Sequence, residues 1–123
     1  MFNALKENYG EFHDCLITEI RYATNFNYHD ISKSGKREVE VFISCFNIAE
    51  DYQRQLIKII CSDVNEFKFG GYEGMIYSAL LKNESDIFIL DFFPIILDGD
   101  NLKEDPNSDC LIKCKAVSYV ILE

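Results

Sequence analysis

The chain has 123 residues, 48% of them hydrophobic and 14% aromatic, and its formal net charge is −9. This length predicts one domain over residues 1–123, which buries about two-thirds of the surface that the unfolded chain exposes. The charge disfavours nucleic acid and membranes as partners, because these polyanions are held through lysine and arginine. The longest apolar run, 87–97, is interrupted by Asp91 and Pro94 and falls short of the roughly 20 residues that cross a bilayer.

The cysteines indicate a reducing compartment. They form an odd set of five without a C-x-x-C pair, and nothing near Met1 reads as a secretory signal. Cys110 and Cys114 lie four residues apart on one expected strand, which separates their Cα atoms by about 13 Å, beyond the reach of a disulfide. We therefore expect a cytoplasmic protein with free cysteines, namely Cys15, Cys45, Cys61, Cys110 and Cys114.

The first segment predicts a short helix followed by a strand. Phe2, Leu5 and Tyr9 recur at helical spacing before Gly10, which suits a helix of one or two turns that packs on a sheet. From residue 12 onward hydrophobic and polar residues alternate, as in a half-buried antiparallel strand. One face is expected to carry Leu16, Ile20, Tyr22, Phe26 and Tyr28, and the other Glu19, Arg21, Asn25 and Asn27.

Two further strands follow a polar connector. Residues 39–45 alternate between Val, Ile or Cys and polar residues, which predicts a second strand that forms a hairpin with the first. Residues 52–61 predict a third strand, with Ile57, Ile59 and Cys61 on one face and with its apolar end buried on both faces. Residues 62–67 predict a capped helical turn, because Ser and Asp accept hydrogen bonds from free backbone N–H groups.

The second half of the chain predicts three more strands. The glycines of 70–74 mark a turn and residues 82–85 another, while 97–109 forms an acidic loop. Strands are expected at 75–81, at 87–93, which is the most apolar and is predicted to be central, and at 111–122. The pattern predicts a mainly β fold, an antiparallel β-sandwich or open barrel of about six strands with a short N-terminal helix.

Catalytic motifs are weak in this sequence. Both histidines precede an aspartate, and a carboxylate can orient an imidazole that acts as a general base. Adjacent residues on a strand point to opposite faces, however, so we interpret His13 as a packed residue at the helix–strand junction and expect Asp14 to bind backbone amides. There is no G-x-S-x-G motif, and the glycines of 70–74 lack the lysine of a phosphate loop. We expect a protein without catalysis or a cofactor.

Acidic residues gather between residues 98 and 109. Their composition resembles a calcium loop, but Leu102 stands where a third ligand belongs and no glycine follows, so no metal site is predicted. A cluster of carboxylates offset only by Lys103 can instead meet the lysines and arginines of a basic protein. The residues predicted to bind this partner are Asp98, Asp100, Glu104, Asp105 and Asp109. A solvated connector is the competing interpretation.

Four short motifs follow one another along the chain: Phe12-His13-Asp14-x-x-Ile17-x-x-Ile20, a Glu/Val-alternating strand, Asp63-Val64-x-x-Phe67, and Asp109-Cys110 at the final strand. This order resembles the small bacterial immunity proteins of polymorphic toxin systems, which open with a Leu/Phe-His-Asp strand. The 70–74 turn does not match their pattern. The resemblance implies a cytoplasmic protein that binds and blocks a cognate toxin, often a nuclease, and a basic toxin suits the acidic balance of the chain.

Three other functions remain open from the residues alone. A structural or assembly protein would show an uncovered sheet edge that pairs with a second copy of the chain. A small-ligand carrier needs an apolar cavity lined by Phe and Ile between its sheets. An enzyme needs a convergent polar pocket, for which His13, Asp14 and Asp91 are the candidates.

Overall fold

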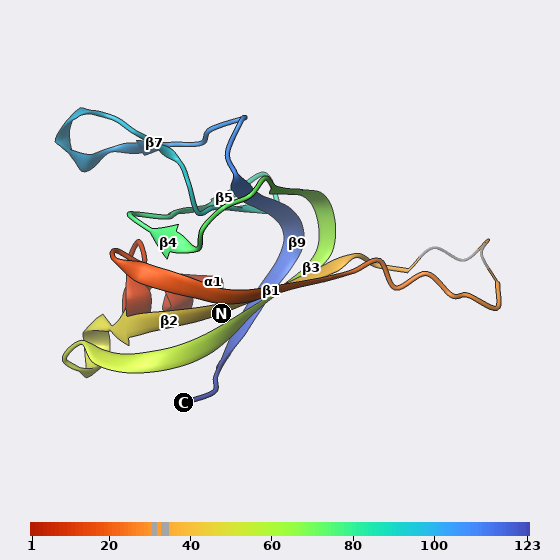
Figure 1. The fold of residues 1–123 in the computed structure, drawn as a ribbon, viewed down its shortest axis with the longest axis horizontal. Coiled ribbons are helices and arrows are strands. Elements are labelled where there is room, and N and C mark those ends of the chain that lie inside the picture. Colours follow the sequence, from red (N-terminus) through yellow and green to blue (C-terminus); the bar gives the residue numbers. More distant parts are fainter. Residues whose placement is uncertain (31, 33–34) are drawn as a thin grey trace.

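The computed structural model describes residues 1–30, 32 and 35–123, and its fold is mostly β. Figure 1 shows a strongly curled sheet from which the connection after the first strand projects as an arm. In chain order the elements are α1 (Phe2–Tyr9), β1 (Cys15–Ala23), β2 (Glu38–Asn47), the 3₁₀ turn η1 (Ile48–Glu50), β3 (Gln53–Phe69), β4 (Met75–Ile76), β5 (Leu80–Glu84), β6 (Ile87–Asp91), β7 (Ile95–Ile96), η2 (Asp98–Asp100), β8 (Leu102–Lys103) and β9 (Cys110–Ile121).

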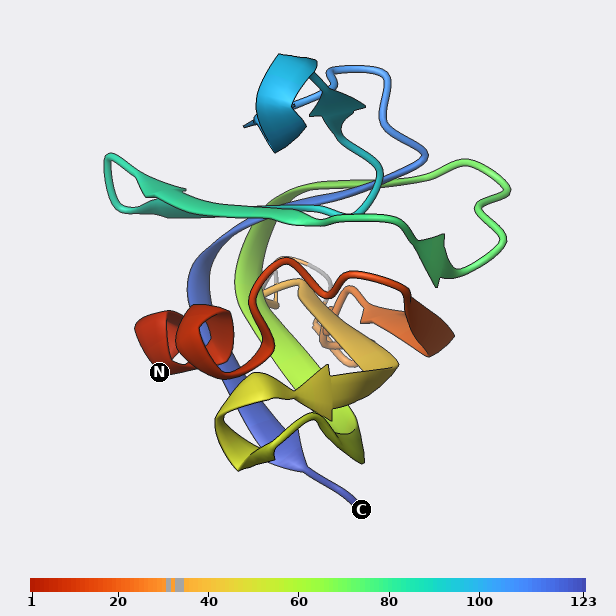
Figure 2. The same cartoon turned by 90° about the vertical axis from the view of Figure 1, so that its left-hand side faces the viewer.

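Seven strands form one antiparallel sheet in the order β4-β1-β2-β3-β9-β6-β5, and β7 with β8 forms a separate hairpin. The sheet curls into a half-barrel, which confirms the predicted open barrel. Its two outermost strands, β4 and β5, follow each other in the chain, so residues 77–79 bridge the gap between the edges. Figure 2 shows α1 lying across the concave side of the sheet, where Phe2, Leu5 and Tyr9 are buried. None of the helices described is long and apolar enough to traverse a bilayer.

The hydrophobic core follows the alternation of β2 and β3. Val39, Val41, Ile43 and Cys45 are fully buried on β2, and so are Ile57, Ile59 and Cys61 on β3, as their spacing predicts. The opposite face of β3 is half-buried at Leu56 and Ile60. The predicted faces of these two strands are therefore confirmed.

The alternation expected for β1 is wrong because the strand contains a β-bulge. Ile17 pairs with Ile43 and Glu19 with Phe42, which leaves Thr18 as an extra residue between them. The bulge changes which face the following side chains occupy, so Cys15 and Ile17 precede it on the inner side and Ile20 follows it there. Leu16, expected beside Ile20, is exposed instead.

The helical turn expected at residues 62–67 is also wrong, because β3 continues as a strand to Phe69. Asp63 has a positive φ of 55°, a conformation that Asp tolerates better than most residues. The pairing of β3 with β9 shifts between Val64 and Glu66. The polar residues that suggest a helix cap therefore form an irregularity within a long strand.

The third departure concerns residues 75–93. The strand expected at 75–81 is split into β4 and β5, and the expected turn at 82–85 moves to Ser85 and Asp86, whose φ values are 50° and 67°. Two consecutive positive φ angles are typical of the tight turns that join hairpin strands. The apolar strand β6 is not central, since β3 is the middle strand of the seven and β6 lies next to the edge strand β5. Its Phe88 packs against Phe2 of the helix, with ring centroids 4.7 Å apart.

All five cysteines are buried and free. Burial raises the pKa of the Cys45 thiol to about 12, and burial together with Asp91 raises that of Cys110 to about 12. Both thiols therefore stay protonated in the fold at neutral pH, and a thiolate is the form that attacks disulfides and oxidants.

Candidate functional site: an aromatic groove beside strand β1

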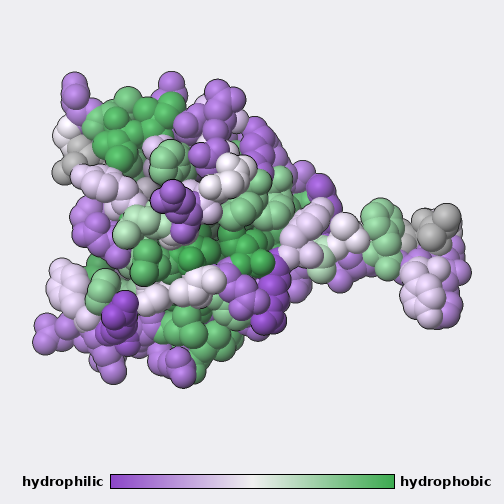
Figure 3. Space-filling model, viewed as in Figure 1, coloured by the Kyte–Doolittle hydropathy of each residue, from purple (hydrophilic) through white to green (hydrophobic). Residues whose placement is uncertain are grey.

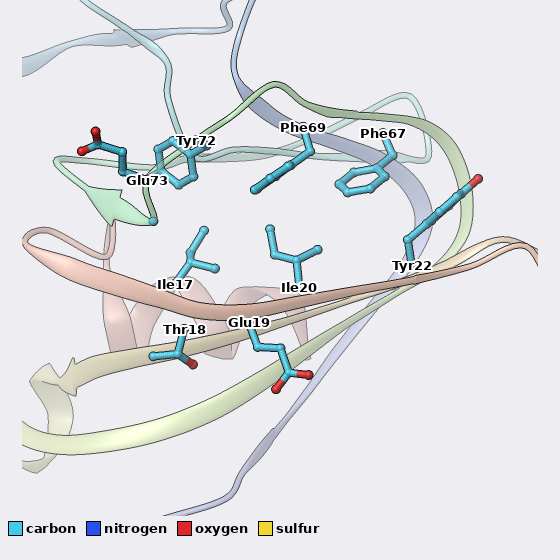
Figure 4. Close-up of a pocket in the computed structure, with 10 residues that line it drawn as sticks. Ile17, Thr18, Glu19, Ile20, Tyr22, Phe67, Phe69, Tyr72 and Glu73 are labelled. Carbon is cyan, nitrogen blue, oxygen red and sulfur yellow. The ribbon is translucent and has the colours of Figure 1, made fainter.

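A groove of about 440 Å³ lies between β1 and the chain that runs from the end of β3 into β4. In Figure 4 Ile17 and Ile20 rise from β1 into this groove and face Tyr72, Phe69 and Phe67, while Thr18 and Glu19 turn to the other side of the strand. The space-filling view in Figure 3 shows hydrophobic residues gathered in the hollow beside β1. The residues that line this aromatic groove are Ile17, Thr18, Glu19, Ile20, Tyr22, Phe67, Phe69, Tyr72, Glu73 and Gly74.

The groove exists because of two local features of the backbone. The bulge at Thr18 lets Ile17 and Ile20 point into the same space although they are three residues apart. At the other end Gly74 brings its carbonyl within 2.7 Å of the Ile17 N–H. Gly74 has a φ of 96°, and a Cβ there would lie only 2.6 Å from the Ile17 carbonyl oxygen, so glycine is needed at this approach.

Aromatic rings form the wall of the groove and remain accessible. Phe69 is 50% exposed and Tyr22 is 44% exposed, although their neighbours Phe67 and Tyr72 are half-buried. The Tyr22 and Phe67 rings pack with centroids 5.2 Å apart. The Tyr72 hydroxyl donates a hydrogen bond to the Met75 carbonyl, and burial raises the pKa of this phenol above its ordinary value. The wall is therefore fixed in place while its outer rings face solvent.

A second hollow of about 370 Å³ lies on the far side of the same connection and shares Tyr72 and Glu73 with the groove. Phe93, Met75 and Asp109 contribute to its lining. Neither hollow is lined by a lysine or an arginine. Within the described residues the carboxylates of Glu73 and Asp109 form no ion pair, whereas Glu19 is paired with Arg21 at 2.5 Å. The charged groups that remain available around the groove are acidic.

Four of the five carboxylates predicted to bind a partner, those of Asp98, Glu104, Asp105 and Asp109, do not share one environment. Glu104 lies 2.9 Å from the Lys113 ammonium, and this contact raises the pKa of Lys113. Asp105 accepts a hydrogen bond from the Asn107 N–H, which forms a local turn. Asp98 is exposed on the tip that joins β7 to β8, and the backbone of Asp100 lies on the same tip. Asp109 lies beside the second hollow. Their role in binding stays a prediction.

Asp91, one of the three candidate catalytic residues, is fully buried and hydrogen-bonded. Its carboxylate accepts from the Phe93 N–H at 3.0 Å, from the Asp105 N–H at 2.9 Å and from the Ser108 hydroxyl at 2.6 Å. These contacts tie both ends of the segment between β6 and β9 to one point. The arrangement suits a structural carboxylate, because a catalytic group has to reach a substrate.

His13 and Asp14 contact each other, contrary to the strand geometry expected for them. Asp14 has a φ of 60°, so the pair lies in a turn, and the His13 Nε2 comes within 3.4 Å of the Asp14 carboxylate. The His13 Nδ1 lies 2.6 Å from the Tyr77 carbonyl, which can only accept, so Nδ1 carries the proton. Nδ1 also lies 3.3 Å from the Ser78 hydroxyl, but a protonated nitrogen cannot take the serine proton.

The role of His13 in the fold follows from these contacts. Its hydrogen bond to Tyr77, together with the 2.6 Å bond from the Ala79 N–H to the Glu11 carbonyl, fastens residues 77–79 to the helix–strand junction. This is the segment that bridges the two edges of the half-barrel. The imidazole itself is exposed, so the expectation of a packed side chain at this junction is not met.

No group of three or more His, Cys, Asp or Glu side chains in residues 1–30, 32 and 35–123 is arranged to hold a metal ion. Comparisons with family models, with curated proteins and with solved structures find no match to this chain. The groove is therefore interpreted from its own geometry and chemistry.

Sequence reasoning missed the residues of the groove. Phe67 and Phe69 alternate on β3 as core residues do, and Tyr72 lies among glycines that predict only a turn. The available signal was the pair of aromatic residues directly before Gly70 and Gly71, which is unusual for a solvent-exposed turn. Nothing local indicates that these rings face β1, a strand about 50 residues earlier in the chain.

Proposed function

We propose that this protein is a non-catalytic binding module that neutralises a basic toxin protein, and that it contacts the toxin through the aromatic groove. The observation that carries the proposal is the exposure of Phe69 and Tyr22 in a groove bordered by the available carboxylate of Glu73. Exposed aromatic clusters are common centres of protein interfaces. The net charge of −9 favours a basic partner, because complementary charge speeds encounter and excludes acidic proteins.

A toxin as the partner is supported by the motif order that resembles immunity proteins. The contacts of the three candidate catalytic residues favour binding over catalysis, because Asp91 is enclosed by donors and the tautomer of His13 cannot activate Ser78. The aromatic rings and carboxylates of the groove are therefore the groups that we assign to binding.

A small apolar ligand is the second candidate, because about 440 Å³ lies within the usual range for ligand pockets. Such pockets enclose most of their ligand, however, and this groove keeps half of the Phe69 ring in solvent. A ligand lying there would leave one side in water. A protein surface covers the rings more completely, so the geometry favours a macromolecular partner.

The test begins with the genes that neighbour this one, and a toxin domain encoded among them is co-expressed with this protein. Cells that make the toxin alone should stop growing, and cells that also make this protein should grow. The variant Phe69→Thr should lose at least tenfold in affinity and fail to protect, because it removes an exposed ring from the centre of the interface. Phe26→Thr is the matched control, since Phe26 is similarly exposed but lies in the connection after β1, outside the residues that line the groove.

Two results would contradict the proposal. Protection by Phe69→Thr equal to that of the unaltered protein would remove the groove from the interface. Absence of a toxin gene from the neighbourhood, combined with saturable binding of a naphthalene sulfonate dye that Phe69→Thr abolishes, would favour the small-ligand carrier.

A further inference from the structure

The edge of β1 that borders the groove lacks a neighbouring strand over most of its length. β4 pairs only with Cys15 and Leu16, and one more bond joins the Ile17 N–H to the Gly74 carbonyl. Residues 71–73 belong to no strand and have no pairing with β1. Within the described residues no strand pairs with this edge from Glu19 to Ala23, although β2 pairs with the opposite edge over the same residues.

The free edge presents unused hydrogen-bonding groups. In an antiparallel pair, alternate residues direct their N–H and C=O groups toward the partner, so half of these groups in Glu19–Ala23 point away from β2. Five residues at strand rise span about 17 Å, which is enough for a short added strand. Proteins usually protect such an edge with charged residues or cover it, because it otherwise pairs with other chains.

From this geometry we infer that the groove receives an extended segment of the partner as an added antiparallel or parallel strand on β1. This inference rests on the proposed function, and it specifies the form in which the partner binds. The added strand would continue the line of β4 along β1, with one row of its side chains facing the groove and the other facing away. Ile20, Phe67 and Phe69 would then receive the inward row.

The chemistry of the lining defines the segment that fits. Apolar side chains at alternate positions match the Ile and Phe residues of the groove, and a lysine or arginine near one end matches Glu73. The absence of lysine and arginine from the described lining residues leaves no partner there for an acidic segment. The occupant is therefore an extended, basic segment with alternating aliphatic or aromatic residues from another protein.

The other free edge of the sheet shows the usual protection. β5 carries Lys82, which forms ion pairs with Glu84 at 3.1 Å and with Glu104 at 4.0 Å. Charged side chains that point along an edge discourage strand addition. The edge of β1 also carries an ion pair, between Glu19 and Arg21, but Glu19 turns to the side of the strand away from the groove. Exposed aromatic rings lie beside this edge on the groove side, which is why we assign strand addition to β1 and not to β5.

The test uses a phage-displayed library of random twelve-residue peptides, panned against the full chain. Enriched peptides should share apolar residues at alternating positions and at least one lysine or arginine. Synthetic copies should bind the Phe69→Thr variant at least tenfold more weakly and the Phe26→Thr control with unchanged affinity. Glu73→Gln should weaken binding severalfold and reduce its dependence on salt, because one exposed charge pair is lost.

Backbone methylation separates strand pairing from simple insertion of side chains. In a paired strand only alternate N–H groups donate to the neighbour. Peptides methylated at alternate nitrogens should therefore fall into two groups, one that loses at least tenfold in affinity and one that keeps its affinity. A uniform effect of methylation, no enriched peptide, or enriched peptides that bind Phe69→Thr normally would overturn strand addition. Toxin protection that depends on Phe69 would still support the proposed function in those cases.

Discussion

The segment between β6 and β9 and the aromatic groove differ in how much of their chemistry the fold already uses. In the segment, Asp91 accepts three hydrogen bonds and Glu104 pairs with Lys113. Charged residues that the sequence suggests as functional candidates therefore already make contacts that stabilise the fold. In the groove, aromatic residues that the sequence suggests for the core remain exposed. The type of a residue therefore indicates function less well than its contacts do. A side chain that the fold leaves exposed and unpaired is the better candidate for binding.

The largest expected effect concerns the carboxylate of Asp91. Asp91→Ala should lower the free energy of unfolding by about 3–5 kcal/mol, because it leaves a small cavity and three donors without an acceptor. Chemical denaturation monitored by circular dichroism measures this loss. Asp98→Asn, an exposed position on the same segment, is the control and should change stability by less than about 0.5 kcal/mol. Equal losses of stability in the two variants would show that the hydrogen bonds of Asp91 do not stabilise the fold more than the exposed carboxylate of Asp98 does.

Raising the pH should weaken the same segment through Cys110. Burial and the nearby Asp91 raise the pKa of this thiol from 9.0 to about 12, so the unfolded chain loses the proton first. Stability is then fully present below about pH 9 and falls toward pH 12, by about 1.4 kcal/mol per pH unit. Urea denaturation at about pH 8, 9.5 and 10.5 should show a decline of about 2 kcal/mol from this thiol. The decline should be shallower by that amount in Cys110→Ala; parallel declines would show that Cys110 does not contribute.

Glu104 should show a smaller effect than Asp91, because its ion pair is partly exposed. Its side chain is 21% exposed and its carboxylate lies 2.9 Å from Lys113 and 4.0 Å from Lys82. Glu104→Gln should lower the free energy of unfolding by about 1 kcal/mol, and high salt should reduce the difference. Thermal denaturation at low and high ionic strength measures both. A difference that does not respond to salt would indicate lost packing rather than a lost ion pair.

The smallest effect on stability is expected in the groove. Phe69→Thr should lower the free energy of unfolding by less than about 1 kcal/mol, because half of the ring is already exposed and threonine favours strands. The same substitution is expected to weaken binding at least tenfold, so stability and function should separate at this residue. A loss of several kcal/mol would mean that Phe69 belongs to the core and that the groove is a packing feature.

The sequence predicted those parts of the fold in which a strand keeps one buried face throughout. β2 and the first half of β3 satisfy this condition, so Val39, Val41, Ile57 and Ile59 were assigned correctly to the core. β1 does not satisfy it, because one extra residue at Thr18 exchanges the faces of the strand.

The groove and the segment between β6 and β9 could not be predicted from the sequence, because both depend on contacts between distant parts of the chain. Phe69 lines a groove whose other side is formed by β1. Asp91 is buried where the chain comes back and the Ser108 hydroxyl donates to its carboxylate. Polar residues at Asp63 and Asp86 did mark positive φ angles, but the angles serve a bulged strand and a hairpin turn. Local composition can indicate an unusual backbone conformation without indicating the element that contains it.

The position of β9 inside the sheet, between β3 and β6, has a consequence for how the chain reaches this fold. β9 pairs with β3 from Cys110 to Ile121, and residues 70–109 lie between the two strands in the chain. Closing a loop of that length costs conformational entropy before the pairing can compensate, which is the usual reason that sheets with distant partners fold in milliseconds to seconds. Until β9 arrives, the edge of β3 that faces away from β2 has no paired neighbour. The slow step of folding is therefore also the step at which two unfinished chains can pair with each other.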